Sequence, residues 1–202
     1  TSLLMDRSRR NFEYKSKAFT SLGKDKFTIV TVSEWMRDQM KDSFLKGCRF
    51  EVIHNGIDTD RFAPVSPDGF ISRYNLQGKH ILLGVASIWS REKGLDDFVK
   101  LASMLREDEI IVLVGLTASQ AAAMQENILG LPKTASVEEL CGIYSAADAF
   151  VNLTWQDNYP TVNLEAISCG TPVITYRTGG SPESIVEDET GFVVEQGDVD
   201  GL

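Results

Sequence analysis

The chain has 202 residues, of which 43% are hydrophobic and 24% are charged, as expected for a globular protein with one sizeable core and some further elements. Its formal net charge is −9, which leaves no broad cationic surface and excludes nucleic acid as a general partner. The charge is uneven, because residues 1–26 hold seven Lys or Arg against three acids, whereas the stretch after Gly180 holds seven acids and no Lys or Arg. A basic N-terminal helix suits peripheral contact with an anionic membrane in the full-length protein, although a solvated face explains the same charges more simply.

The three cysteines, Cys48, Cys141 and Cys169, are far apart and lie in apolar or helical contexts. This distribution is typical of reduced core residues and predicts neither a disulfide frame nor a metal site. No apolar run approaches the roughly eighteen residues of a membrane span, and no leader with a cleavage signal opens the sequence. We therefore expect a cytoplasmic protein, with the inner face of the membrane as its other possible location.

Residues 1–53 predict one strand–helix unit with a helix in front of it. Scattered apolar positions favour a helix over 3–22, and FTIVTV predicts a buried strand over 27–32. Ser33 is a suitable N-cap for a helix that runs to Gly47. Alternation in RFEVIH predicts a strand over 49–54, which leads into Asn55-Gly56, a strong turn signal.

Beyond a loop with Pro64 and Pro67, short apolar strands alternate with helices. The predicted strands are 80–87, 109–115, 127–131, 148–153, 172–176 and 191–194. The predicted helices cover 95–105 and 161–169, open at the capping boxes Thr117/Gln120 and Ser136/Glu139, and include a short one at Ser181-Pro182. This alternation predicts an α/β fold, a doubly wound parallel sheet of about six strands that is covered on both faces.

Five loops follow the predicted strands and should converge at the carboxyl edge of the sheet, where open parallel sheets bind ligands. They are 87–94, 115–117, 130–136, 154–161 and 177–181. None contains the Gly-Lys-Ser/Thr phosphate loop or the G-x-G-x-x-G fingerprint, so the sequence favours neither ATP hydrolysis nor classical NAD binding.

The stretch 154–172 carries two carboxylates eight positions apart, Asp157 in a loop and Glu165 on a helix. Together with Arg91 and Lys93 they suit a nucleotide-sugar site, because cations and a helix N-terminus stabilise the charge of a departing diphosphate. Glu165 is placed to accept hydrogen bonds from ribose hydroxyls and Asp157 from a sugar hydroxyl. The remaining candidate contacts are the backbone of Asn158, Tyr159, Pro160 and Thr161, the turn Gly179-Gly180, and the backbone from Leu131 to Lys133 for the base.

Several ordered segments closely resemble the C-terminal half of the retaining glycosyltransferases of family 4. They are VIHNGID (52–58), REKG (91–94), SVEEL (136–140) and DNYPTVNLEAISCGTPVI (157–174), and the resemblance covers roughly residues 27–202. It implies a two-lobed GT-B fold in which 1–53 are the tail of the acceptor-binding lobe and 54–202 the nucleotide-sugar donor-binding lobe, both cut from a larger protein. It also implies transfer without a metal cofactor to a saccharide or lipid-linked acceptor.

The same resemblance implies that Lys93 binds the donor diphosphate, Glu165 the ribose and Asp157 the donor sugar. Two departures stand out. Asp157 occupies a position where the family has Glu, and Ile88-Trp89 stand where it usually has Arg, which leaves Arg91 as the substitute. Two alternatives stay open: a GT-B-fold nucleotide-sugar epimerase, and a non-catalytic module that binds nucleotide sugars. The base, the sugar and the acceptor also stay open.

Overall fold

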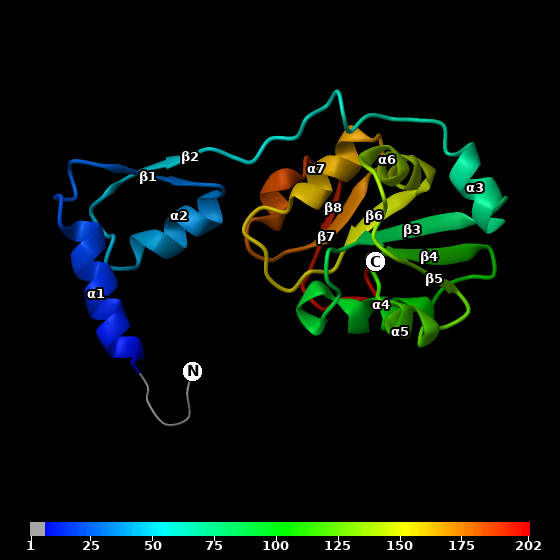
Figure 1. Ribbon diagram of the computed structural model, residues 1–202, viewed down its shortest axis with the longest axis horizontal. Coiled ribbons are helices and arrows are strands. Elements are labelled where there is room, and N and C mark those ends of the chain that lie inside the picture. Colours follow the sequence, from blue (N-terminus) through cyan, green and yellow to red (C-terminus); the bar gives the residue numbers. More distant parts are fainter. Residues whose placement is uncertain (1–6) are drawn as a thin grey trace. The chain divides into compact units, whose positions relative to one another are not determined.

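A computed structural model describes residues 7–202 (Figure 1). The chain divides into two compact units, Thr1–His54 and Asn55–Leu202, and each is described by itself. The first contains α1 (Ser8–Thr20), β1 (Thr28–Thr31), α2 (Glu34–Lys41) and β2 (Arg49–Val52). β1 and β2 pair in parallel, with Thr28 opposite Arg49. These elements confirm the predicted strand–helix unit; the first residues of the predicted helix 3–22 lie outside the described part.

α2 begins as predicted, because the Ser33 side chain accepts a hydrogen bond from the Met36 N–H at 3.1 Å. It ends at Lys41, well before Gly47, so the predicted length is wrong. The hydroxyl of Ser43 donates to the Met40 carbonyl at 2.6 Å and accepts from the Leu45 N–H at 3.1 Å. Such bonds between a side chain and nearby backbone compete with the helical ladder and explain the early end.

The predicted turn at Asn55-Gly56 is also wrong. Neither residue adopts the positive φ that a type I′ turn requires, and the segment has no regular hydrogen bonding. Instead the Asn55 side chain donates to the Tyr159 carbonyl at 3.3 Å, which holds the start of the second unit to a loop more than a hundred residues away.

The second unit is built on a six-stranded parallel sheet with the order β5-β4-β3-β6-β7-β8, which confirms the predicted doubly wound sheet. Its strands are β3 (His80–Val85), β4 (Glu109–Val114), β5 (Ile128–Leu131), β6 (Ala149–Asn152), β7 (Val173–Tyr176) and β8 (Gly191–Val194). The helices are α3 (Asp68–Tyr74), α4 (Leu95–Ala102), α5 (Ala118–Ala122), α6 (Val137–Ala146) and α7 (Thr161–Ser168), with 3₁₀ turns η1 (Arg91–Lys93) and η2 (Ser181–Ser184).

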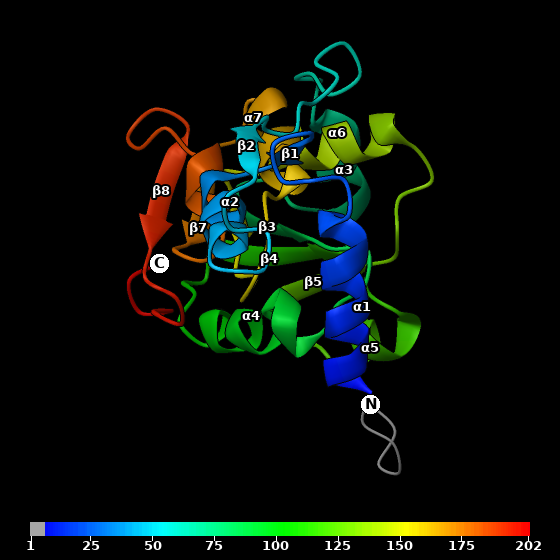
Figure 2. The same ribbon diagram turned by 90° about the vertical axis from the view of Figure 1, so that its left-hand side faces the viewer.

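Alternating side chains bury both faces of this sheet, as the two-residue period of a strand requires. In β4, Val112 and Val114 pack into the core under α6 and α7, whereas Ile111 and Leu113 pack into the core with α4. Figures 1 and 2 show the sheet between α3, α6 and α7 on one side and α4 and α5 on the other.

Helix α3 was not predicted, since the sequence analysis left a loop around Pro64 and Pro67. It has only seven residues, begins after Pro67 and ends at Asn75, whose φ of 55° terminates the helix in the left-handed region. Its apolar residues pack on the same core as α6.

The predicted N-caps of α5 and α6, Thr117 and Ser136, are both confirmed, and Thr117 forms the full capping box with Gln120. The predicted box of Ser136 with Glu139 is incomplete, because the Glu139 carboxylate accepts from the Ala135 N–H at 2.8 Å and not from the N–H of Ser136.

Gly142 offers a test of local helix stability, because a Cβ built there meets no atom within 4 Å. Glycine in a helix interior is less favourable than alanine by about 0.5–1 kcal/mol. Gly142→Ala in α6 is therefore expected to raise the free energy of unfolding in urea by about that amount. A loss of stability would contradict the open space at this position.

Candidate functional site

The candidate site lies where the strand connections change direction. The chain runs from β3 to β4 and β5 towards one edge of the sheet, and from β6 to β7 and β8 towards the other. β3 and β6 are therefore neighbours whose following loops separate, and this is the position where doubly wound sheets leave a crevice for ligands.

Two adjoining pockets open at this position, and both are lined by residues 85–87 and Val162. The first, called the switch pocket, has about 320 Å³ and is lined by Val85, Ala86, Ser87, Lys93, Thr154, Asp157, Tyr159, Pro160, Thr161 and Val162. The second, called the side pocket, has about 290 Å³ and is lined by Val85, Ala86, Ser87, Val114, Gly115, Lys133, Thr134, Leu140 and Val162. The sequence therefore placed several of its candidates around one crevice.

An ion pair between Lys93 and Asp157 dominates the polar chemistry of the switch pocket. The Lys93 Nζ lies 3.1 Å from the Asp157 Oδ2, and the two side chains are 40% and 26% exposed. Partial burial strengthens the attraction relative to a fully exposed pair, yet leaves both groups accessible to a ligand. The pocket therefore offers a cation and a carboxylate whose charges neutralise each other.

Asp157 is held in place by the predicted turn Gly179-Gly180. Gly179 has a φ of +54°, and a Cβ built on it would stand 1.9 Å from the Asp157 carbonyl oxygen. The Gly180 N–H donates to that same carbonyl at 3.0 Å. In this structure the glycine pair braces the Asp157 loop from behind, because only a residue without a side chain allows the two backbones to approach so closely.

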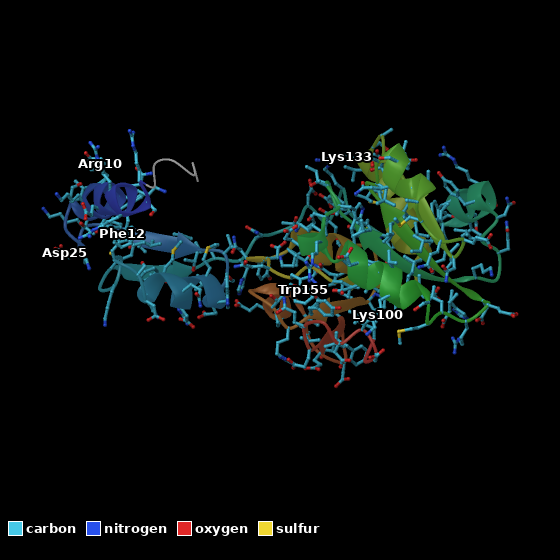
Figure 3. The ribbon with its side chains drawn as sticks, turned by 90° about the horizontal axis from the view of Figure 1, so that it is seen from below. Arg10, Phe12, Asp25, Lys100, Lys133 and Trp155 are labelled. Carbon is cyan, nitrogen blue, oxygen red and sulfur yellow. The ribbon has the colours of Figure 1, made fainter. Side chains whose placement is uncertain are left out.

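Lys93 is fixed from the side of β6 in a similar way. Gly94 has a φ of +77°, and a Cβ there would lie 2.3 Å from the Leu153 carbonyl oxygen. The Trp155 N–H donates to the Glu92 carbonyl at 2.9 Å, and the Trp155 indole donates to Asp97 in α4 at 2.8 Å. Trp155, which is labelled in Figure 3, is therefore a brace between this loop and α4.

Glu165 lies one turn beyond Val162 on α7 but lines neither pocket. Its Oε2 accepts a hydrogen bond from the Tyr144 hydroxyl at 3.0 Å. Burial raises the pKa of the Glu165 carboxyl above its ordinary value, and the Tyr144 hydrogen bond opposes part of that rise. One oxygen is thus engaged, and the carboxylate is poised to accept further hydrogen bonds.

Other predicted residues are placed differently. Arg91 does not line either pocket; its side chain is 88% exposed and its guanidinium lies 3.9 Å from Asp96. Asn158 is exposed and does not line the pockets. The Leu131 carbonyl accepts from the N–H groups of Gly115 and Leu116, both at 2.9 Å, whereas Lys133 is exposed and lines the side pocket. Figure 3 shows Lys133 apart from Trp155 and Lys100.

The sequence analysis overlooked a buried polar group beneath the site. Asn163 is fully buried in α7 and is hydrogen-bonded to Asn152, Ser181 and Ser184. A polar residue between Val162 and Leu164, on a helix that otherwise packs on the sheet, was the available signal.

Fold and site together define a doubly wound α/β domain with a crevice at its topological switch point that holds the Lys93–Asp157 ion pair. Residues 79–202 match the family model described as glycosyl transferases group 1. The chain belongs to this family. The chain is 30% identical, over 92% of its length, to a GDP-mannose-dependent alpha-(1-6)-phosphatidylinositol monomannoside mannosyltransferase of Mycolicibacterium smegmatis. It is 27% identical, over 75% of its length, to a D-inositol 3-phosphate glycosyltransferase of Mycobacterium sp. strain JLS.

Solved structures share the fold. Sucrose-phosphate synthase from Thermosynechococcus elongatus matches 93% of this chain with a TM-score of 0.76 at 21% identity, over 50% of its own length. Anabaena HepE in complex with UDP-glucose matches 96% of this chain with a TM-score of 0.75 at 16% identity, over 56% of its own length. The chain spans 53% and 37% of the two mycobacterial relatives.

Among residues 7–202, no helix combines the length and apolar character needed to traverse a lipid bilayer. The same part of the chain contains no cluster of three or more His, Cys, Asp or Glu side chains arranged to hold a metal ion.

The brace at Gly179 can be tested with Gly179→Ala. The added Cβ would collide with the Asp157 carbonyl, and alanine at positive φ costs about 1–2 kcal/mol, so we expect lower thermal stability and about tenfold weaker binding of UDP-glucose or GDP-mannose, with the affinity for UDP or GDP nearly unchanged. Calorimetry measures both, with Gly142→Ala as the matched control that leaves affinity unchanged. Full affinity in Gly179→Ala would show that the Asp157 loop does not depend on this contact.

The pKa of Glu165 gives a pH-dependent prediction. A carboxyl whose pKa rises on folding destabilises the fold only while it is ionised. Glu165→Gln is therefore expected to unfold at a higher temperature than the parent at pH 7, and this gain should disappear as the pH falls below the ordinary value of 4.5. Thermal unfolding from pH 4 to pH 8 measures it, with the exposed Glu187→Gln as control.

The same Glu165→Gln variant should bind nucleotide about tenfold more weakly, since a hydrogen bond to a charged acceptor is worth more than one to an amide. A variant that is more stable than the parent but binds nucleotide more weakly would indicate that Glu165 serves ligand binding at a cost in stability. Unchanged affinity would remove Glu165 from the nucleotide site.

Proposed function

We propose that this chain is the donor-binding part of a retaining hexosyltransferase. In the complete enzyme a sugar moves from a nucleotide-sugar donor to a saccharide or lipid-linked acceptor. The observation that carries the proposal is the Lys93–Asp157 pair in a crevice at the switch point, with Glu165 one turn along α7. The names of the relatives support it, because one is a GDP-mannose-dependent mannosyltransferase and another structure holds UDP-glucose.

The proposed roles follow from the charge of each group. Cleavage of the bond between the anomeric carbon and the phosphate oxygen leaves the electron pair on the nucleoside diphosphate. Lys93 stabilises that developing charge, as a positioned cation does in other phosphate-leaving reactions. Asp157 accepts hydrogen bonds from a hydroxyl of the sugar, and Glu165 accepts them from the ribose. The side pocket beside Lys133 is the proposed position of the base.

The proposal also covers the two lobes, the metal requirement and the membrane contact of the full-length enzyme. We expect residues 1–53 to be the tail of the acceptor-binding lobe and 54–202 the donor-binding lobe. Transfer is expected to proceed without a metal, so EDTA should leave the activity of the full-length enzyme unchanged. Peripheral contact with the inner membrane face is proposed for α1, which carries Arg9, Arg10, Lys15 and Lys17 beside the exposed Phe12 and Phe19.

The ion pair provides the principal test. Lys93→Ala should weaken binding of UDP or GDP about tenfold or more, since it removes the cation and leaves Asp157 facing the phosphates. Asp157→Asn should bind the nucleoside diphosphate at least as well as the parent, because Lys93 is released, while turnover of UDP-glucose or GDP-mannose by the full-length enzyme falls. Calorimetry and product analysis measure these effects.

Lys100→Ala is the matched control, because Lys100 pairs with Asp200 and lies outside both pockets. If Lys93→Ala binds nucleotide as well as Lys100→Ala does, the assignment of the site is wrong. An isomerised donor without any acceptor product would favour an epimerase. Nucleotide-sugar binding by a full-length protein that yields no product would favour a non-catalytic module.

A further inference from the structure

Asn163 forms the centre of a buried polar network under the switch pocket. Its side chain is 0% exposed, and its Oδ1 accepts from the Asn152 Nδ2 at 2.8 Å. Its Nδ2 donates to the hydroxyls of Ser184 at 2.9 Å and Ser181 at 3.3 Å. One side chain on α7 thus joins the end of β6 to the turn η2 that follows β7.

The network reaches the wall of the pocket at two places. On the β6 side, the Asn152 Oδ1 accepts from the N–H of Thr154, a lining residue, at 3.2 Å. On the β7 side, Ser181 directly follows Gly180, whose N–H holds the Asp157 carbonyl. The start of the loop that carries Asp157 is therefore connected to Asn163 through Asn152, and its middle is connected through Ser181 and Gly180.

Thr175 closes the network from below. Its hydroxyl lies 2.7 Å from the Ser181 hydroxyl and donates to the Asn152 carbonyl at 3.3 Å. Among the described residues, no buried side-chain nitrogen or oxygen lacks a hydrogen-bond partner. A fully satisfied network in a low dielectric is rigid, because any displacement leaves a polar group unpaired at a penalty of about 1–3 kcal/mol.

Packing alone does not require such a group here. An apolar side chain of similar volume would fill the same space between α7 and the sheet without the desolvation penalty of an amide. The hydrogen bonds do, however, fix directions that an apolar contact leaves free. The observed network sets the Asp157 loop against the turn 179–181.

We propose that Asn163 is a positioning residue that fixes the loop 154–160 against the turn 179–181 and so sets the place of Asp157 opposite Lys93. Asn163 does not line the pocket and acts through Thr154 and Gly180. The effect of this positioning on recognition of the donor sugar rests on the proposed function. The positioning of the loop itself does not depend on any ligand.

The first measurement therefore uses amide hydrogen exchange of the chain without ligand. Asn163→Leu keeps the branched shape of the side chain and removes the hydrogen bonds, and we expect the amides of Thr154 and Gly180 to exchange about tenfold faster, the equivalent of one lost hydrogen bond. Unchanged protection at both amides in Asn163→Leu would overturn the inference.

Thr175→Val is the milder variant should Asn163→Leu fail to fold, since it removes one hydroxyl and keeps the shape of the side chain. Its matched control is Thr171→Val, another buried threonine, whose hydroxyl donates to the Tyr144 carbonyl at 2.6 Å away from the pocket. Faster exchange of Gly180 in Thr175→Val and not in Thr171→Val supports the inference. Equal effects in both would reduce the network to general stability and overturn it.

The second measurement compares the affinity for UDP with that for UDP-glucose, and for GDP with that for GDP-mannose, in the same variants. Loss of positioning should reduce by about tenfold the ratio of the affinity for the nucleotide sugar to that for the nucleoside diphosphate. The affinity for the nucleoside diphosphate itself should stay nearly unchanged. A parent chain that binds none of the four probes would contradict the proposed function, whereas the exchange results would still decide the role of Asn163.

Discussion

The candidate site depends on the close approach of backbones at the carboxyl edge of the sheet. Loops that follow different strands have to lie almost in contact there, and two of the contacts are possible only because the facing residue is glycine. Gly179 touches the carbonyl of Asp157, and Gly94 touches the carbonyl of Leu153. Since Asp157 and the neighbour of Gly94 form the ion pair, these backbone contacts fix the main-chain positions from which the two side chains reach each other.

A second layer of constraints lies beneath these loops and is polar. Asn163, Asn152 and Ser181 replace the apolar contacts that occupy the rest of the core between α7 and the sheet. Different interactions thus stabilise the core and the rim of the domain. Alternating aliphatic side chains hold the sheet and helices together, and hydrogen bonds near the rim fix the loops, because only directional bonds specify the orientation of a loop.

The sequence predicted the fold well because its signals were local. Runs such as HILLGVAS and EIIVLVG, with N-caps at Ser33, Thr117 and Ser136, sufficed for the order and type of the elements. The prediction was wrong where the local structure depends on a residue far away in the sequence, and it missed an element that is too short to show a periodic pattern. Asn55 is drawn to the Tyr159 carbonyl in place of a turn, and α3 is too short to show a period. Of the candidate site, the resemblance singled out Lys93 and Asp157, which lie in one pocket, whereas the hydrogen bonds of the buried Asn163 come from two other elements, β6 and η2.

The aspartate side chain of Asp157 is one methylene shorter than a glutamate, and its ion pair with Lys93 gives this difference a physical consequence. In the structure its carboxylate neutralises Lys93, so the pocket carries little net charge before a ligand binds. A diphosphate that binds Lys93 has to displace this carboxylate, because two anions cannot share one cation without mutual repulsion. On the proposed function, the displaced carboxylate becomes available when the sugar reaches it, and a longer glutamate would release it at a different position. On the same proposal, the choice of aspartate at position 157, where the resemblance leads us to expect glutamate, affects the diphosphate contact as well as the sugar contact.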